Sequence, residues 1–310
     1  MRVLRAVAVE AEGGLVGATA EAVKQLRERT GAGMMECKKA LVEMNGDLDA
    51  AAELMRKQGL AKADKKAARV AAEGVISLEK SADGKSAAMV EVNCETDFVA
   101  RESDFQGFSA EVVKLTLGFN PADINALGAL KLASGENVDE RRRALVAKIG
   151  ENISLRRLTI LSSGGFLGAY RHGTRIGALV AIEGGSAELA HDLAMHVAAA
   201  NPDYLSASDV PSDVLAKERE IETEKALAEG KPVEIVAKMI EGRLRKTFNE
   251  RALLGQAFVK YPDQTIAKLL KAAKAEVKAF RRFEVGAGIE KKQDDFVGEV
   301  MAQVKASSGK

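Results

Sequence analysis

The sequence predicts an α+β protein built from helices and antiparallel β-hairpins. Apolar residues in 19–58 and in 105–115 recur every three or four positions, as on one face of a helix. Apolar residues in 75–92 and in 166–182 alternate instead, as in a strand. The order hairpin, polar corner and helix occurs twice, which indicates two related subdomains with antiparallel sheets.

The composition restricts the class of protein. The 310 residues suffice for two or three modest domains, and 46% of them are hydrophobic, as in soluble globular proteins. A net charge of +1 gives no reason to expect nucleic acid as the main partner. Two cysteines are too few for a disulfide framework, and no apolar run approaches the roughly 20 residues that cross a bilayer. We expect a cytoplasmic protein without membrane contact.

Residues 1–18 precede the periodic pattern. They contain a short apolar run that Glu10 and Glu12 follow, whereas a secretory signal needs a longer apolar centre uninterrupted by acid. A transit peptide is the alternative, but the segment is short and carries these two acids. We expect a poorly ordered extension, such as a misassigned upstream start.

Residues 19–60 predict a bundle of three short helices, a common type of protein-docking module. Gly31 and Gly33 separate the first two helices, Asp47 is the N-cap of the third, and the third ends near Gly59. Residues 61–74 follow as a solvated linker helix. The helical spacing is carried by Val23 and Leu26, by Met34, Cys37, Leu41 and Met44, and by Leu48, Ala51, Leu54 and Met55.

The remaining chain divides into five predicted parts. Core subdomain N, residues 75–151, contains the first hairpin and a helix whose N-cap is Asp97 or Ser103. Core subdomain C comprises 152–209 and 249–290, with strands at 153–161, 166–172, 176–182 and 279–285. An antiparallel helical hairpin at 210–248 is inserted into it, with Val214, Ile221 and Leu227 on one arm and Val236, Ile240 and Leu244 on the other. Residues 291–310 predict a C-terminal amphipathic helix and a tail.

Few residues suggest chemistry. The sequence has no phosphate loop, no dinucleotide-binding fingerprint and no metal-ligand spacing, so we expect no cofactor and no metal. Cys94 with a histidine could form a nucleophile–base pair, but a small side chain in a strand favours packing, as for Cys37 on a helix. His191 and His196 are five residues apart and lie on different helix faces.

The corner Thr96-Asp97-Phe98-Val99 has two interpretations. If the following helix begins at Asp97, Phe98 lies near the face of Phe105 and belongs to the core. Alternatively, Phe98 is presented at a helix start to wedge into a partner, with Asp97 as cap or charged neighbour.

Three further residues are candidate partner contacts. Met34 and Met35 cannot share one helix face, so at least one meets solvent or a partner. His172 ends a strand at a hairpin turn, where we expect an exposed side chain.

Two motifs resemble those of the bacterial translation elongation factor Ts family. They are the stretch Val23–Leu41 and the corner Thr96–Val99. Similar blocks are Ala147–Ile153, His172–Gly177, Ala194–Ala199 and Arg282–Gly286. The resemblance runs from about Thr19 to the C-terminus, and the extra N-terminal segment departs from it. It implies a docking bundle of the ubiquitin-associated (UBA) type, a two-part core, a helical hairpin and a C-terminal helix.

The resemblance also implies a function. Such a protein is a guanine nucleotide exchange factor for elongation factor Tu and has no covalent catalysis. The family's motif, here Thr96–Val99, intrudes beside the Mg²⁺ site of the partner, with Phe98 as the wedge. The region of His172 disturbs the phosphate loop, and the bundle and the C-terminal helix, with Phe296 and Val300, clamp the GTPase. The helical hairpin is a candidate for self-association. A passive binding module and a cysteine enzyme are the alternatives.

Overall fold

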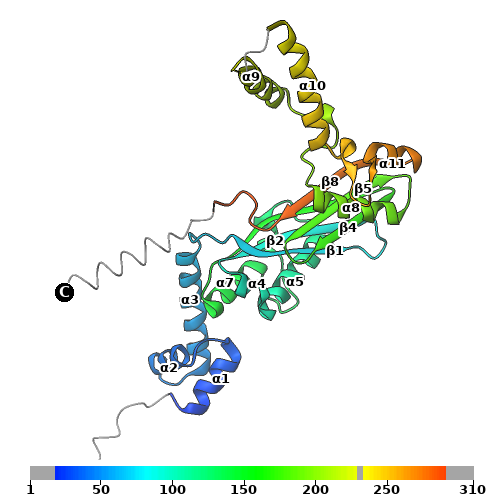
Figure 1. Ribbon diagram of the computed structural model, residues 1–310. Coiled ribbons are helices and arrows are strands. Elements are labelled where there is room, and N and C mark those ends of the chain that lie inside the picture. The colour runs from blue at the N-terminus through cyan, green and yellow to red at the C-terminus, as the bar shows by residue number, and fades with distance from the viewer. Residues whose placement is uncertain (1–17, 229–232, 291–310) are drawn as a thin grey trace, which may run out of the picture.

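The computed structural model describes residues 18–228 and 233–290, and it confirms the α+β class. Figure 1 shows an elongated molecule with the N-terminal bundle at one end, the sheets in the middle and a pair of long helices at the other end. The predictions for residues 1–17 and for the C-terminal helix, with Phe296 and Val300, lie outside the described residues.

The N-terminal bundle consists of α1 (Ala20–Thr30), α2 (Met34–Glu43) and the first half of α3 (Leu48–Lys66). Asp47 caps α3 as predicted, because its side chain accepts hydrogen bonds from the backbone N–H groups of Asp49 and Ala50. Leu26, Cys37 and Leu41 are fully buried between the helices. Cys37 is therefore a packing residue, as expected.

The predicted end of α3 at Gly59 is wrong, because the helix continues to Lys66. Glycine costs about 1 kcal/mol inside a helix, but here it permits close packing against α7 (Val138–Ile149). A Cβ atom at Gly59 would lie 3.1 Å from the Cβ of Ala147. Residues 61–66 of the predicted linker helix thus continue α3, with Ala63 buried in the core of subdomain N, whereas 67–72 are not helical and β1 begins at Glu73.

The strands of the core form two three-stranded antiparallel sheets within the described residues. The first has the order β1 (Glu73–Lys80), β2 (Ser86–Cys94), β3 (Ile153–Ser162). The second has the order β4 (Phe166–His172), β5 (Ile176–Glu183), β8 (Glu276–Glu284). Both predicted hairpins are confirmed. The sheets pack against each other through Ile76, Met89, Leu167, Leu179, Ala181 and Phe283.

Helices cover the outer faces of the two sheets. On the first sheet lie α5 (Ser103–Phe119), α6 (Ile124–Ala129) and α7, and on the second lies α8 (Ala187–Ala200) (Figure 1). Central strand β2 is consequently buried on both faces. Near α8 lie a 3-10 turn η2 (Leu253–Gly255), the short hairpin β6 (Ala257–Phe258) and β7 (Tyr261–Thr265), and α11 (Ile266–Ala272), none of which the sequence pattern predicted.

The helical hairpin consists of α9 (Ser212–Ala228) and α10 (Val233–Arg251), which follow a 3-10 turn η1 (Ala207–Asp209). Ala226, Ile240, Leu244 and Phe248 are buried in it. Leu227 lies on the first arm, as predicted, but its side chain is 47% exposed there. No helix in the described parts of the chain is long and apolar enough to cross a membrane.

Candidate functional site

The corner after β2 contains a one-turn helix, α4 (Asp97–Arg101). Its N-cap is Thr96, whose hydroxyl oxygen accepts a hydrogen bond from the backbone N–H of Val99 at 3.4 Å. The predicted caps, Asp97 and Ser103, are wrong, because both residues already lie inside helices and Glu102 occupies the cap position of α5.

Phe98 projects from α4 into solvent. Its exposed fraction is 75%, whereas Val99 and Ala100 beside it are buried. The core interpretation of Phe98 is therefore wrong. Glu102 causes the difference, since its extended backbone (φ −63°, ψ 136°) ends α4 before α5 begins and takes Phe98 out of phase with Phe105. An exposed phenylalanine gives up burial energy of about 2 kcal/mol, which a binding partner could recover.

The surroundings of Phe98 are polar and bonded. Asp97 accepts a hydrogen bond from the guanidinium of Arg101 at 2.6 Å in an exposed ion pair.

Cys94 is fully buried, and its thiol donates to the backbone oxygen of Thr96 at 3.1 Å. Burial, together with the negative charges of Glu151 and Glu73, raises the pKa of the Cys94 thiol to about 12. A neutral buried thiol is a poor nucleophile, which removes the support for a cysteine enzyme.

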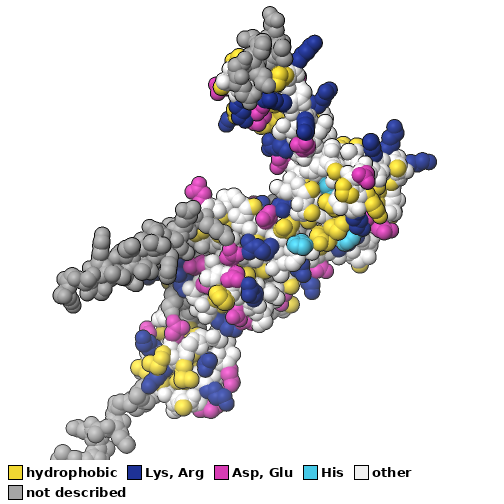
Figure 2. All heavy atoms as spheres, in the orientation of Figure 1, with side chains coloured by type: hydrophobic (Ala, Val, Ile, Leu, Met, Phe, Trp, Pro, Cys, Tyr) yellow, Lys and Arg dark blue, Asp and Glu magenta, His cyan; other side chains and the backbone are white. Residues whose placement is uncertain are grey.

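Met34 and Met35 are both exposed on α2, with exposed fractions of 58% and 64%. The expectation that at least one of the two meets solvent is confirmed, and it holds for both. Val42 is also exposed, and Figure 2 shows hydrophobic side chains on the surface of the N-terminal bundle. A shallow hollow of about 290 Å³ is lined by Met35, Lys38, Lys39, Val42 and Glu43.

His172 ends β4 as an exposed residue and belongs to a group of three rings. Its Nδ1 atom lies 3.4 Å from the Tyr170 hydroxyl, and Tyr170 meets the ring of His191 edge to face at 5.8 Å. Tyr170 and His191 were not among the residues predicted from the sequence. The two-residue spacing of Tyr170 and His172 along a strand could have placed them on one face. Figure 2 shows histidines among exposed hydrophobic side chains on the second subdomain.

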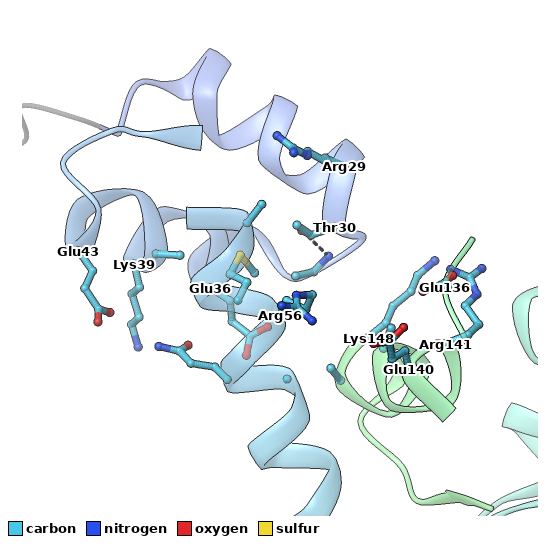
Figure 3. A pocket seen from close by; sticks show the side chains of 18 residues that line it. Arg29, Thr30, Glu36, Lys39, Glu43, Arg56, Glu136, Glu140, Arg141 and Lys148 are labelled. Atoms are coloured by element: carbon cyan, nitrogen blue, oxygen red, sulfur yellow. Dashed lines mark hydrogen bonds and ion pairs between the residues drawn. The ribbon is translucent and has the colours of Figure 1, made fainter. Parts of the chain in front are cut away.

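A crevice of about 680 Å³ separates the N-terminal bundle from α7 (Figure 3). Both walls carry charges of both signs, with Arg29, Glu36 and Arg56 on the bundle and Glu140 and Lys148 on α7. Such a mixture favours neither an anion nor a cation. Among the described residues, no group of three or more His, Cys, Asp and Glu side chains is arranged to hold a metal ion.

Comparison with known proteins decides the family. The family model described as "Elongation factor TS" matches residues 95–287. The chain is 57% identical over 290 residues to elongation factor Ts of Methylococcus capsulatus, covering 93% of this chain and 99% of that protein. It is 55% identical over 291 residues to elongation factor Ts of Thioalkalivibrio sulfidiphilus, with the same coverage.

The chain belongs to the elongation factor Ts family. The elongation factor Ts of Legionella pneumophila, 53% identical over 287 residues, covers 93% of this chain and 98% of its own length. The resemblance deduced from the two motifs is thus confirmed. Thr96–Val99 and His172 lie inside the residues that the family model matches, while Met34 and Met35 precede them.

Proposed function

We propose that this protein binds elongation factor Tu in its GDP-bound form and promotes release of GDP, so that GTP can rebind. Membership of the elongation factor Ts family supports the partner and the reaction. The exposed phenylalanine on a one-turn helix is the observation that supports the way release is achieved. The reaction involves no covalent chemistry on this chain.

The physical basis of such exchange is reciprocal coupling. A GTPase holds GDP through a phosphate loop and a Mg²⁺ ion. A partner that prefers the nucleotide-free GTPase must weaken nucleotide binding by the same factor by which the nucleotide weakens partner binding. A loss of about 4 kcal/mol in nucleotide affinity corresponds to about a thousandfold. A few wedge contacts supported by a large interface can supply that difference.

We assign the wedge to Thr96-Asp97-Phe98-Val99. Phe98, at 75% exposure, inserts beside the Mg²⁺ site of elongation factor Tu, and Asp97 helps to displace the groups that support the ion. The ring group around His172 contacts the region of the phosphate loop from the second subdomain. Met34 and Met35 on α2 provide adaptable apolar contacts that hold the GTPase domain.

Two further predictions from the sequence concern other segments of this chain. Phe296 and Val300 of the C-terminal segment are proposed as further contacts to the GTPase. Self-association through the helical hairpin also stays a prediction, which sedimentation of the purified protein would check.

Stopped-flow release of a fluorescent GDP from elongation factor Tu tests the proposal. We expect the release rate to grow with the concentration of this protein and to decrease at high Mg²⁺, because the ion and the wedge compete. Binding without acceleration would leave a passive binding module. No binding at all would contradict the proposed partner.

A further inference from the structure

Thr96 is fixed by hydrogen bonds at each of its polar groups. Its backbone N–H donates to Glu151 Oε2 at 3.0 Å, and its hydroxyl donates to Glu151 Oε1 at 2.7 Å. Its backbone oxygen accepts from the Cys94 thiol and from the N–H of Ala100. This residue therefore connects the end of β2 rigidly to the start of α4, two residues before Phe98.

The carboxylate of Glu151 determines how the Thr96 hydroxyl is used. A hydroxyl has one proton and two lone pairs, whereas an ionised carboxylate has no proton and only accepts hydrogen bonds. The proton is therefore committed to Glu151, and a lone pair faces the N–H of Val99 at 3.4 Å. Glu151 thus orients the group that caps α4.

A second carboxylate makes a similar contact from the segment of Thr96 to the segment of Glu151. Glu95 Oε1 accepts a hydrogen bond from the backbone N–H of Asn152 at 2.6 Å, while Glu151 accepts one from the N–H of Thr96. The two segments adjoin at the paired ends of β2 and β3, where Cys94 lies opposite Ile153. Each segment provides the acceptor for the other, so the corner and the 151–152 turn hold each other in place.

Helix α4 has five residues and needs such an anchor. An isolated helix of this length is unstable in water, because helix nucleation is costly. Without the anchor, the Phe98 side chain would sample several directions, and the effective rate of insertion would fall with the fraction that points correctly.

We propose that Glu151 is a positioning residue for nucleotide exchange, acting through Thr96 to present Phe98. This role rests on the proposed exchange function. It differs from a structural role in a measurable way, because it concerns the rate of the step after docking and not the docking itself.

The test compares Glu151→Ala and Glu151→Gln with Glu111→Ala, an exposed carboxylate on α5 of the same subdomain. We measure the maximal rate of fluorescent GDP release from elongation factor Tu and the concentration that gives half of it. For Glu151→Ala we expect a maximal rate about tenfold lower, on the scale of one lost charge-assisted hydrogen bond, and an unchanged half-saturating concentration. Glu151→Gln keeps an oxygen acceptor and should lose less.

Two further measurements separate positioning from general damage. Hydrogen exchange of the Thr96 and Val99 amides in the free protein should accelerate in Glu151→Ala, with unchanged protection in β5. In the Phe98→Ala background, Glu151→Ala should add no further loss, because both changes remove the same wedge.

The outcomes are distinct. If the unmodified protein fails to accelerate GDP release, the proposed function is overturned, and the role of Glu151 in exchange with it. If the unmodified protein is active and Glu151→Ala matches Glu111→Ala in rate, the positioning role alone is overturned. An additive loss in the double variant also contradicts it.

Discussion

The carboxylate of Glu91 accepts a hydrogen bond at 2.8 Å from the backbone N–H of Gly286, a residue 195 positions away in the sequence. Glu91 is fully buried on β2 and also contacts Arg156 at 2.9 Å and Arg157 at 2.6 Å. Burial opposes ionisation, but these donors outweigh it and hold the pKa of the Glu91 carboxyl below its usual value. Glu91 thereby links the first sheet to the segment that follows β8 of the second sheet.

Replacing Glu91 by Gln should lower the free energy of unfolding by about 2–3 kcal/mol. Removing one member of a fully buried ion pair costs about 3–5 kcal/mol, and the loss is smaller here because both arginines partly reach solvent. Urea denaturation measures the change. Glu276→Gln removes an exposed carboxylate and should shift stability by less than about 0.5 kcal/mol. Equal effects of the two substitutions would contradict the importance of this link.

His196 should make the protein less stable in mild acid. Its ring is fully buried, with Nε2 3.0 Å from the Gln256 side-chain oxygen, while Nδ1 accepts from the N–H of Val259 at 3.3 Å. Burial lowers the pKa of His196 below its usual 6.5. As pH falls below about 6.5, the unfolded chain binds a proton that the folded chain refuses, so unfolding becomes easier until the folded-state pKa is reached.

The measurement for this histidine is urea denaturation between pH 7.5 and 5.5. The free energy of unfolding of His196→Gln should decline less steeply than that of the unmodified protein, by up to about 1.4 kcal/mol per pH unit. His172→Gln, at an exposed site, serves as the control and should keep the original slope. The same slope in all three proteins would show that His196 does not titrate as described.

Gly168 should tolerate no side chain. A Cβ atom there would lie 1.8 Å from the backbone oxygen of Ala190, where β4 passes under α8. Gly168→Ala should lower the free energy of unfolding by about 3 kcal/mol or more, since backbone would have to move. Gly164→Ala is the matched control, because a Cβ atom there meets nothing within 4 Å. Comparable melting temperatures for the two variants would contradict this packing.

Phe98→Ala should keep docking to elongation factor Tu and lower the maximal rate of GDP release by at least about tenfold, on the scale of a buried aromatic contact. The physical reason is that Phe98 is exposed before binding, so the fold loses little. Phe119→Ala is the control, because Phe119 is 66% exposed on the same subdomain. Unimpaired release by Phe98→Ala would contradict the wedge.

Periodicity predicted the sheets well and the corner poorly. The strands around the two hairpins were visible because β2 and β5 are short and mostly apolar, and nearly every residue of both is buried. The place of Phe98 was not visible, since it depends on one extended residue, Glu102, that separates two helices.

The contacts of the site depended on residues distant in sequence. Glu151 and Thr96 meet because β2 and β3 pair, which no local pattern reveals. The low helix propensity of Gly59 predicted a helix end there, but packing against Ala147 outweighs that propensity and the helix continues.

Because α3 is uninterrupted, it fixes both the distance and the relative rotation between the N-terminal bundle and core subdomain N. Its 19 residues make a rod roughly 28 Å long, and each residue turns the chain by about 100°. Lys66 at its end donates to the backbone oxygen of Gly150, next to Glu151. Inserting one residue into this rod would rotate Met34 and Met35 by more than a quarter turn relative to Phe98. The number of residues in α3 therefore sets the direction in which Met34 and Met35 face relative to Phe98.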